Sequence, residues 1–109
     1  MARAGKVKVI IKRPDEKYGH VCNISTKLEN LQKTVEGHIE TVPAVNGAII
    51  LCNEEGKLKG LEPNMWYFHD RLVGTIIVIG SDGEEFADVP ISLAQWKTFV
   101  DKQEELGPL

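Results

Sequence analysis

Apolar and polar residues alternate at the start of the chain, which predicts a β-strand. Val7, Val9 and Ile11 share one face of this strand, and the positions between and beside them are mostly lysine. A turn at residues 14–17 precedes a second strand pattern at residues 18–24. The chain therefore begins with a predicted antiparallel hairpin.

Two segments have the apolar spacing of amphipathic helices. The first begins with a capping box of Thr26 and Glu29, whose side chains can satisfy free amides, and Gly37 suits a left-handed cap at its end. The second begins with the same pattern at Ser92 and Gln95 and ends at Gly107 and Pro108. The apolar faces are Leu28, Leu31 and Val35 in the first helix, and Leu93, Trp96, Phe99 and Val100 in the second.

The middle of the chain predicts strands of two kinds. Residues 39–45 resemble an edge strand because Pro43 cannot donate to a ladder. Asn46 and Gly47 predict a tight hairpin turn, since both tolerate positive φ. Residues 48–52 and 73–79 are continuously apolar, so these strands must be covered on both faces.

A further turn at residues 81–83 leads into a last strand at residues 85–89. The elements together predict one domain over residues 1–109 in the α+β class, a mostly antiparallel sheet of about five to seven strands with two helices. The predicted order is β-β-α-β-β-β-β-β-α. Because two short helices need not cover both sheet faces, we expect a homo-oligomer that buries the second face against another copy.

Composition narrows the classes of function. Thirteen Lys and Arg residues stand against sixteen Asp and Glu, for a net charge of −3. This balance argues against a strongly basic nucleic-acid binder and against a polyanionic mimic, so no nucleic-acid partner is expected. No stretch reaches the apolar length of a membrane span, and the chain shows no hydrophobic secretion segment at its start. We expect a cytoplasmic location without a membrane partner.

The motifs of common catalytic and cofactor sites are missing from the sequence. It contains no G-x-S-x-G, P-loop, H-E-x-x-H or G-x-G-x-x-G pattern. Cys22 and Cys52 are far apart and are expected to be buried thiols, although either could pair with a histidine as a nucleophile. His20 and Cys22 could contribute to a zinc site, but one H-x-C pair is a weak signal. We expect no enzyme, catalytic residue, cofactor or metal.

Basic residues are concentrated at the start of the chain. They are Arg3, Lys6, Lys8, Lys12 and Arg13. Lysines on an edge strand discourage strand addition by another chain, which is one interpretation. The other is a face that contacts phosphate, with Lys8 as a candidate ligand-binding residue.

A turn and an aromatic segment provide the other candidate binding residues. The turn at residues 53–57 either closes a hairpin or cradles an anion with its amides, Asn53 and Lys57. Residues 64–71 hold three of the seven aromatic residues in a row. In a strand, alternate side chains face opposite ways, so one pair is expected in the core while the other stacks on a base with Arg71 near phosphate. The candidates are Asn53, Lys57, Asn64, Trp66, Tyr67, His69 and Arg71, together with Lys8.

Residues 52–64, with the sequence CNEEGKLKGLEPN, resemble the signature of a small uncharacterised domain family of phages and integrative elements from Gram-positive bacteria. The flanking segments LENLQ at residues 28–32 and VEGHIE at residues 35–40 are similar as well, and the resemblance runs from about Val7 to Val100. It implies an origin in a mobile element, no established enzymatic activity and no catalytic residues. This chain departs from the family between Asn64 and Leu72, where the family usually has a longer acidic segment.

Two functions are therefore expected. The first is a non-enzymatic binding protein that sequesters a nucleotide-type signal of host immunity, which requires affinity and no chemistry. The alternative is an interaction module that binds a host protein and inhibits or redirects it. In that case Trp66, Tyr67 and Phe68 would form an exposed anchor, because aromatic residues and arginine dominate interface hot spots.

Overall fold

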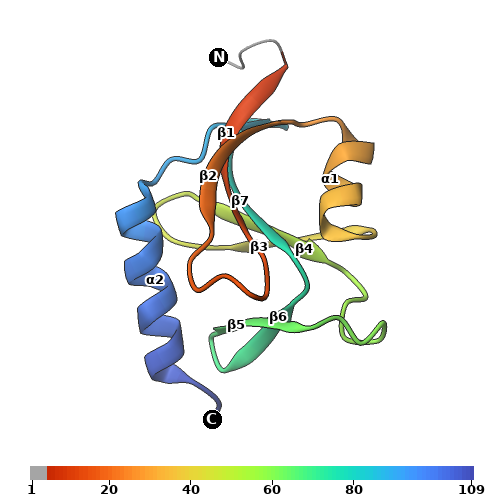
Figure 1. The fold of residues 1–109 in the computed structure, drawn as a ribbon. Coiled ribbons are helices and arrows are strands. Elements are labelled where there is room, and N and C mark those ends of the chain that lie inside the picture. The colour runs from red at the N-terminus through yellow and green to blue at the C-terminus, as the bar shows by residue number, and fades with distance from the viewer. Residues whose placement is uncertain (1–4) are drawn as a thin grey trace.

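A computed structural model describes residues 5–109, so Arg3 lies outside the described residues. The strands are β1 (Lys6–Lys12), β2 (His20–Ser25), β3 (Ile39–Pro43), β4 (Ile49–Asn53), β5 (Pro63–Tyr67), β6 (Asp70–Val73), β7 (Ile76–Asp82) and β8 (Glu85–Ala87), and the helices are α1 (Leu28–Val35) and α2 (Leu93–Leu106). The α+β class and the places of both helices are confirmed (Figure 1). Within the described residues, neither helix has the length and apolarity needed to cross a membrane.

The strands form one main sheet and a separate hairpin. The hydrogen-bonded order of the main sheet is β2-β1-β7-β4-β3, with β8 paired to the far end of β7, and every pair is antiparallel. The hairpin consists of β5 and β6. The described residues contain eight strands. The aromatic segment contributes two of them, because it folds back on itself as β5 and β6 outside the main sheet.

Each face of the main sheet carries its own apolar core. On one face, residues such as Val9 and Ile77 pack with Leu31 and Val35 of α1. On the other face, Ile50 and Val78 pack with Trp96 and Val100 of α2, and Met65 brings the β5–β6 hairpin onto the same core. Figure 1 shows the two helices on opposite sides of the sheet.

Both sheet faces are therefore covered within one chain, and the central side chains of Ile50, Leu51, Ile77 and Val78 are fully buried. The bare face from which self-association was expected is not present in the described residues. Self-association remains a prediction, but it would have to use another surface.

The position of β1 corrects the edge-strand interpretation of the lysines. β1 lies between β2 and β7, so its lysines do not protect a sheet edge. Lys8 is exposed, but Lys12 is only 2% exposed and is one of the largest buried side chains. The alternation that places Lys12 on the polar face therefore fails at the end of the strand, where another segment covers it.

Helix α1 begins and ends differently from the prediction. Its N-cap is Lys27, without a side-chain cap, because β2 continues to Ser25 and the Ser25 hydroxyl accepts from the Lys27 amide at 3.2 Å. The capping box at Thr26 is wrong. At the other end Glu36, one residue before the predicted Gly37, adopts the left-handed conformation with φ of 65°.

Side-chain contacts from β4 explain the shifted end of α1. The amide of Asn53 donates to the carbonyl oxygens of Val35 and Glu36, each at 3.0 Å. These bonds satisfy carbonyls that a helix C-terminus otherwise leaves without a partner, so the chain turns before the glycine is reached.

Replacement of Glu36 by glycine is expected to stabilise the protein. The left-handed conformation costs a residue with a side chain about 1 kcal/mol, and glycine adopts it freely. Urea unfolding should show a gain of up to about 1 kcal/mol for Glu36→Gly. Thr34→Gly, within the same helix, should instead lose a few tenths of a kcal/mol. An unchanged or lower stability of Glu36→Gly would contradict the role of this cap.

The predicted strand at residues 73–79 is divided, because Val73 ends β6, Gly74 has a positive φ, and β7 begins at Ile76.

Three other local predictions hold. Ser92 and Gln95 form a capping box at the start of α2, and Gly107 caps its end. Asn46 and Gly47 both have positive φ in the turn between β3 and β4. β3 lies at the sheet edge, as Pro43 predicts.

Candidate functional site

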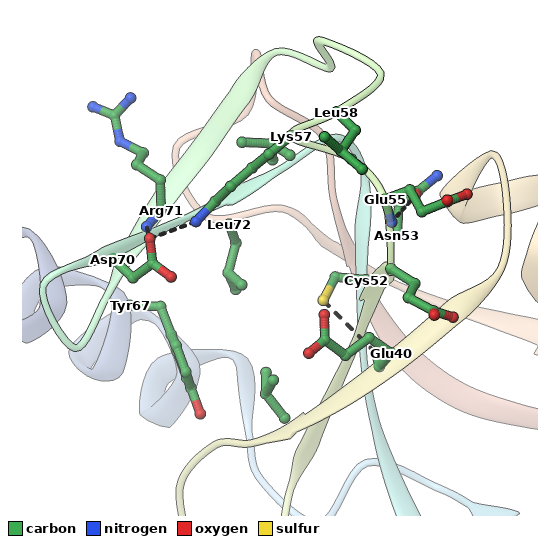
Figure 2. Close-up of a pocket in the computed structure, with 14 residues that line it drawn as sticks. Glu40, Cys52, Asn53, Glu55, Lys57, Leu58, Tyr67, Asp70, Arg71 and Leu72 are labelled. Carbon is green, nitrogen blue, oxygen red and sulfur yellow. Dashed lines mark hydrogen bonds and ion pairs between the residues drawn. The ribbon is translucent and has the colours of Figure 1, made fainter.

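A cleft of about 230 Å³ opens between the β3–β4 ladder and the β5–β6 hairpin (Figure 2). β3 contributes Glu40 and Val42, β4 contributes Cys52, and the following loop and the hairpin form the remaining walls. Four of the eight predicted ligand-binding residues line it, namely Asn53, Lys57, Tyr67 and Arg71. Asn64, Trp66, His69 and Lys8 do not line this cleft.

The inner part of the cleft is apolar and contains one thiol. Val42 and Leu72 pack against the buried core, and the Cys52 thiol donates to the Glu40 carbonyl oxygen at 3.7 Å. Burial, together with the negative charge of Glu40, raises the pKa of Cys52 to about 11. The thiol is therefore protonated near neutral pH, which argues against a role as a nucleophile.

The rim carries more negative than positive charge. Its acidic side chains are Glu40, Glu54, Glu55 and Asp70, and its basic side chains are Lys57 and Arg71. The Lys57 ammonium is 2.6 Å from the Asp70 carboxylate, and the hydrogen bond from Lys57 holds the pKa of Asp70 below its usual value. Both groups are largely exposed, so this pair contributes little to stability.

The end of β4 and the loop after it do not present free amides to an anion. Asn53 is buried, and its side-chain oxygen accepts from the Glu55 amide at 2.8 Å while its NH₂ group caps α1. The Glu54 amide donates to His38, and the Gly56 amide donates back to Asn53. Because these amides already have partners within the protein, they are not available to an anion, and the role of Asn53 is structural.

The hairpin directs its aromatic side chains to opposite faces. Tyr67 lines the cleft, and its hydroxyl donates to the Pro43 carbonyl oxygen at 2.6 Å. Burial raises the pKa of Tyr67. Trp66 pairs across the hairpin with Arg71, whose guanidinium lies 4.3 Å from the centre of the Trp66 ring. Figure 2 shows this guanidinium turned away from the middle of the cleft.

Asn64 binds a buried lysine instead of a ligand. The Lys12 ammonium donates to the Asn64 side-chain oxygen at 2.8 Å, to the Asn64 carbonyl at 3.2 Å and to the Glu16 carbonyl at 2.7 Å. The Asn64 NH₂ group donates in turn to the carbonyls of Lys12 and Gly74. Desolvation lowers the pKa of Lys12. This network joins β1, β5 and the residue after β6, and it uses every polar atom of the Asn64 side chain.

The remaining candidates lie elsewhere. The Lys8 backbone amide donates to Asp88, on a part of β1 remote from the cleft in sequence and sheet position. A ring nitrogen of His69 is 3.0 Å from the Gly107 carbonyl oxygen. His20 is paired with Glu16 at 2.8 Å, and no group of three metal-binding side chains is found among residues 5–109.

The tip of the hairpin is the most unusual backbone feature. Phe68 and His69 form the turn between β5 and β6, with φ of 47° and 70°. Glycine, asparagine and aspartate are the usual residues in such turns, so two bulky residues here are strained. Phe68 is 56% exposed.

Helix α2 holds this strained tip in place. The buried side chain of Gln103 accepts from the Phe68 amide at 2.6 Å, and Glu104 accepts from the Trp66 amide at 3.0 Å. Neither acceptor was predicted from the sequence. The helical spacing could have identified Gln103, because it follows Trp96 and Val100 on the buried face of α2, and a buried polar side chain requires a hydrogen-bond partner. Glu40, which shares its strand face with Val42, was not predicted as a site residue either.

The comparison with known protein families gives a match. Residues 7–103 match the family model described as a domain of unknown function, DUF3846. No curated protein and no solved structure matches the chain.

Proposed function

The chain belongs to the DUF3846 family, a domain of unknown function, and we propose that it is a non-enzymatic module that docks on another protein through the tip of its β5–β6 hairpin. The observation that carries this proposal is the exposed Phe68 side chain on a strained turn. Strained backbone persists where the surrounding structure enforces it, and it is concentrated at functional positions.

The contacts of α2 with the hairpin support a binding role for the tip. Gln103 and Glu104 accept hydrogen bonds from the hairpin backbone and hold it in place. The Phe68 ring contacts Tyr67 and Phe99 edge-on at centroid distances of 4.9 and 6.3 Å. The aromatic side chain is therefore ordered before a partner arrives, which lowers the entropic cost of association.

The hairpin that carries Phe68 also has the composition of an interface anchor. Trp66 on β5 and Arg71 on β6 are stacked on each other, and both are partly exposed. Tryptophan, tyrosine and arginine are the residues most enriched among those that dominate binding energy. The anchor tip, as we call Trp66, Phe68 and Arg71, thus combines aromatic surface with a fixed positive charge.

A capture experiment tests this function. The protein is immobilised, exposed to a bacterial lysate, and any protein retained in stoichiometric amount is purified and titrated. Phe68→Asn should weaken its binding by about 30-fold or more, because hot-spot side chains contribute about 2 kcal/mol or more and asparagine preserves the turn. Leu28→Ala, which removes an exposed apolar side chain on α1 away from the hairpin and the cleft, should change the affinity less than about threefold. Equal binding by Phe68→Asn, or no stoichiometric protein, would contradict the proposal.

A nucleotide-type ligand is the second candidate, with the protein acting as a sponge for an immune signal on behalf of a phage or mobile element in the bacterial cytoplasm. It is supported by the position of Lys57, Tyr67 and Arg71 around one cleft. It is opposed by the four carboxylates of the rim and by a volume of about 230 Å³, below the roughly 300–1,000 Å³ typical of ligand sites.

Calorimetry separates the two candidates. Titration with a panel of cyclic and ADP-ribose-derived nucleotides should give no heat of binding if the protein acts only by docking. Binding that is lost in Lys57→Ala would instead favour the sponge.

The oligomeric state is tested separately. A mass near 12.1 kDa by light scattering at micromolar concentration would rule out the predicted homo-oligomer.

A further inference from the structure

Strand β3 presents an open edge of the main sheet. It pairs with β4 on one side and is last in the strand order. The direction of its backbone groups follows from two flanking bonds, Glu54 amide to His38 carbonyl and Ala44 amide to Ala48 carbonyl. In an antiparallel ladder the hydrogen-bonded pairs alternate with non-bonded pairs, so Glu40 and Val42 direct their backbone groups to β4.

The intervening residues direct their backbone groups outward. Ile39 and Thr41 thus present both an amide and a carbonyl at the sheet edge. Pro43 has no amide, and its carbonyl accepts from the Tyr67 hydroxyl, which closes that end of the edge. A short edge with a free donor and acceptor at two alternate residues is the template that an added strand uses.

The cleft lies beside this edge, on the face to which Glu40 points. Figure 2 shows the Glu40 carboxylate directed into the cleft. In an added strand, the residue opposite Glu40 projects to the same face of the sheet and therefore into the cleft. The register of the edge thus selects which side chain of a bound segment enters.

The charges around the cleft select a basic side chain. Lys57 is paired with Asp70 and Arg71 is stacked on Trp66, whereas Glu40, Glu54 and Glu55 have no ion-pair partner among the described residues. An arginine or lysine placed there would meet unpaired carboxylates, and an acidic side chain would be repelled.

From the open edge and the charge of the cleft, we propose that β3 binds an extended, basic segment of a partner protein as an additional strand, with a lysine or arginine of that segment opposite Glu40. This inference rests on the proposed function in that the partner is a protein. It concerns a surface separate from Phe68, so the segment and the anchor tip would hold the partner at two points.

The probe is a fluorescent, end-blocked heptapeptide of alternating threonine and valine with a central arginine, compared with a matched peptide with a central glutamate. Fluorescence anisotropy at low ionic strength should show at least about tenfold tighter binding of the arginine peptide. The preference should shrink as salt is added, because exposed charges are screened. Equal affinity for the two peptides would overturn the inference.

Two variants and a direct readout locate the bound peptide. Thr41→Pro removes only an outward amide, so the ladder with β4 is kept and peptide binding should be lost. Glu40→Gln should reduce the preference for arginine, whereas Glu84→Gln, in the exposed turn after β7, should leave it unchanged. Amide hydrogen exchange of Ile39 and Thr41 should slow when the peptide binds. Binding without this protection would contradict strand addition.

The outcomes separate this inference from the proposed function. In one outcome, binding of a captured protein depends on Phe68, but Thr41→Pro and Glu40→Gln change neither the binding of that protein nor the binding of the arginine peptide. The strand-addition inference then fails and the docking function stands. If no protein is captured while the arginine peptide protects Ile39 and Thr41, the strand-addition site stands and docking through the anchor tip fails.

Discussion

Replacement of Asn64 by leucine is expected to lower the free energy of unfolding by about 3 kcal/mol or more. The change removes the side-chain oxygen that accepts from the buried Lys12 ammonium, and it leaves the carbonyls of Lys12 and Gly74 without their donor. A buried charge that loses part of its hydrogen bonding is costly, because water cannot replace the lost partner. Urea unfolding of the two proteins measures the difference.

A double-mutant cycle shows whether the buried ammonium is responsible. Lys12→Met removes the charge while keeping much of the side-chain volume, so the loss from Asn64→Leu should be smaller in that background by about 1 kcal/mol or more. Asn23→Leu, at an exposed position on β2, should change stability by less than about 0.5 kcal/mol. Additive effects of the two substitutions at positions 12 and 64 would contradict the network.

Stability is expected to fall by about 2 kcal/mol between pH 9 and pH 11 through the titration of Cys52. The folded pKa of this thiol is raised from 9.0 to about 11, first by burial and then by the charge of Glu40. Since the unfolded chain releases the proton more readily, this contribution is fully present below pH 9 and is lost as the pH rises through 11. Denaturant unfolding under reducing conditions at several pH values measures it.

The variant Cys52→Val isolates this contribution, because valine cannot titrate and is close in volume. Over the same pH range, its stability should decline by about 2 kcal/mol less than that of the natural chain. The raised pKa of Tyr67 acts in the same direction and the lowered pKa of Lys12 in the opposite one. Both residues are present in the two proteins, and the pKa of Tyr67 is raised mainly by burial and only secondly by Cys52. Equal declines would show that Cys52 does not have the shifted pKa.

Local patterns were sufficient wherever neighbours in sequence are also the interacting groups. The capping box of Ser92 and Gln95, the turn at Asn46 and Gly47 and the edge position of Pro43 all depend on a few adjacent residues. The box at Thr26 failed although its pattern is the same. A strand that continued to Ser25 and an asparagine from β4 decided the limits of α1, and neither contact can be inferred from the helix itself.

The candidate site was predicted only in part for a related reason. Residue type identified Lys57, Tyr67 and Arg71, which do meet around one cleft. It also selected Asn53 and Asn64, whose polar groups are used inside the protein to end a helix and to hold a buried lysine. An asparagine side chain offers the same donors and acceptor to a ligand as to the rest of the protein, so only its hydrogen-bond partners in the structure show which role it has.

The sequence by itself determined the α+β class, the two helices, the apolar central strands and the preference of β3 for an edge, because these follow from periodicity and from the chemistry of single residues. The tertiary structure alone decided that α1 and α2 take opposite faces, that Lys12 is buried, and that the aromatic segment forms a separate hairpin clamped by Gln103. Each of these depends on contacts between segments distant in the chain. Such contacts are chosen by the packing of the whole molecule, which no local pattern records.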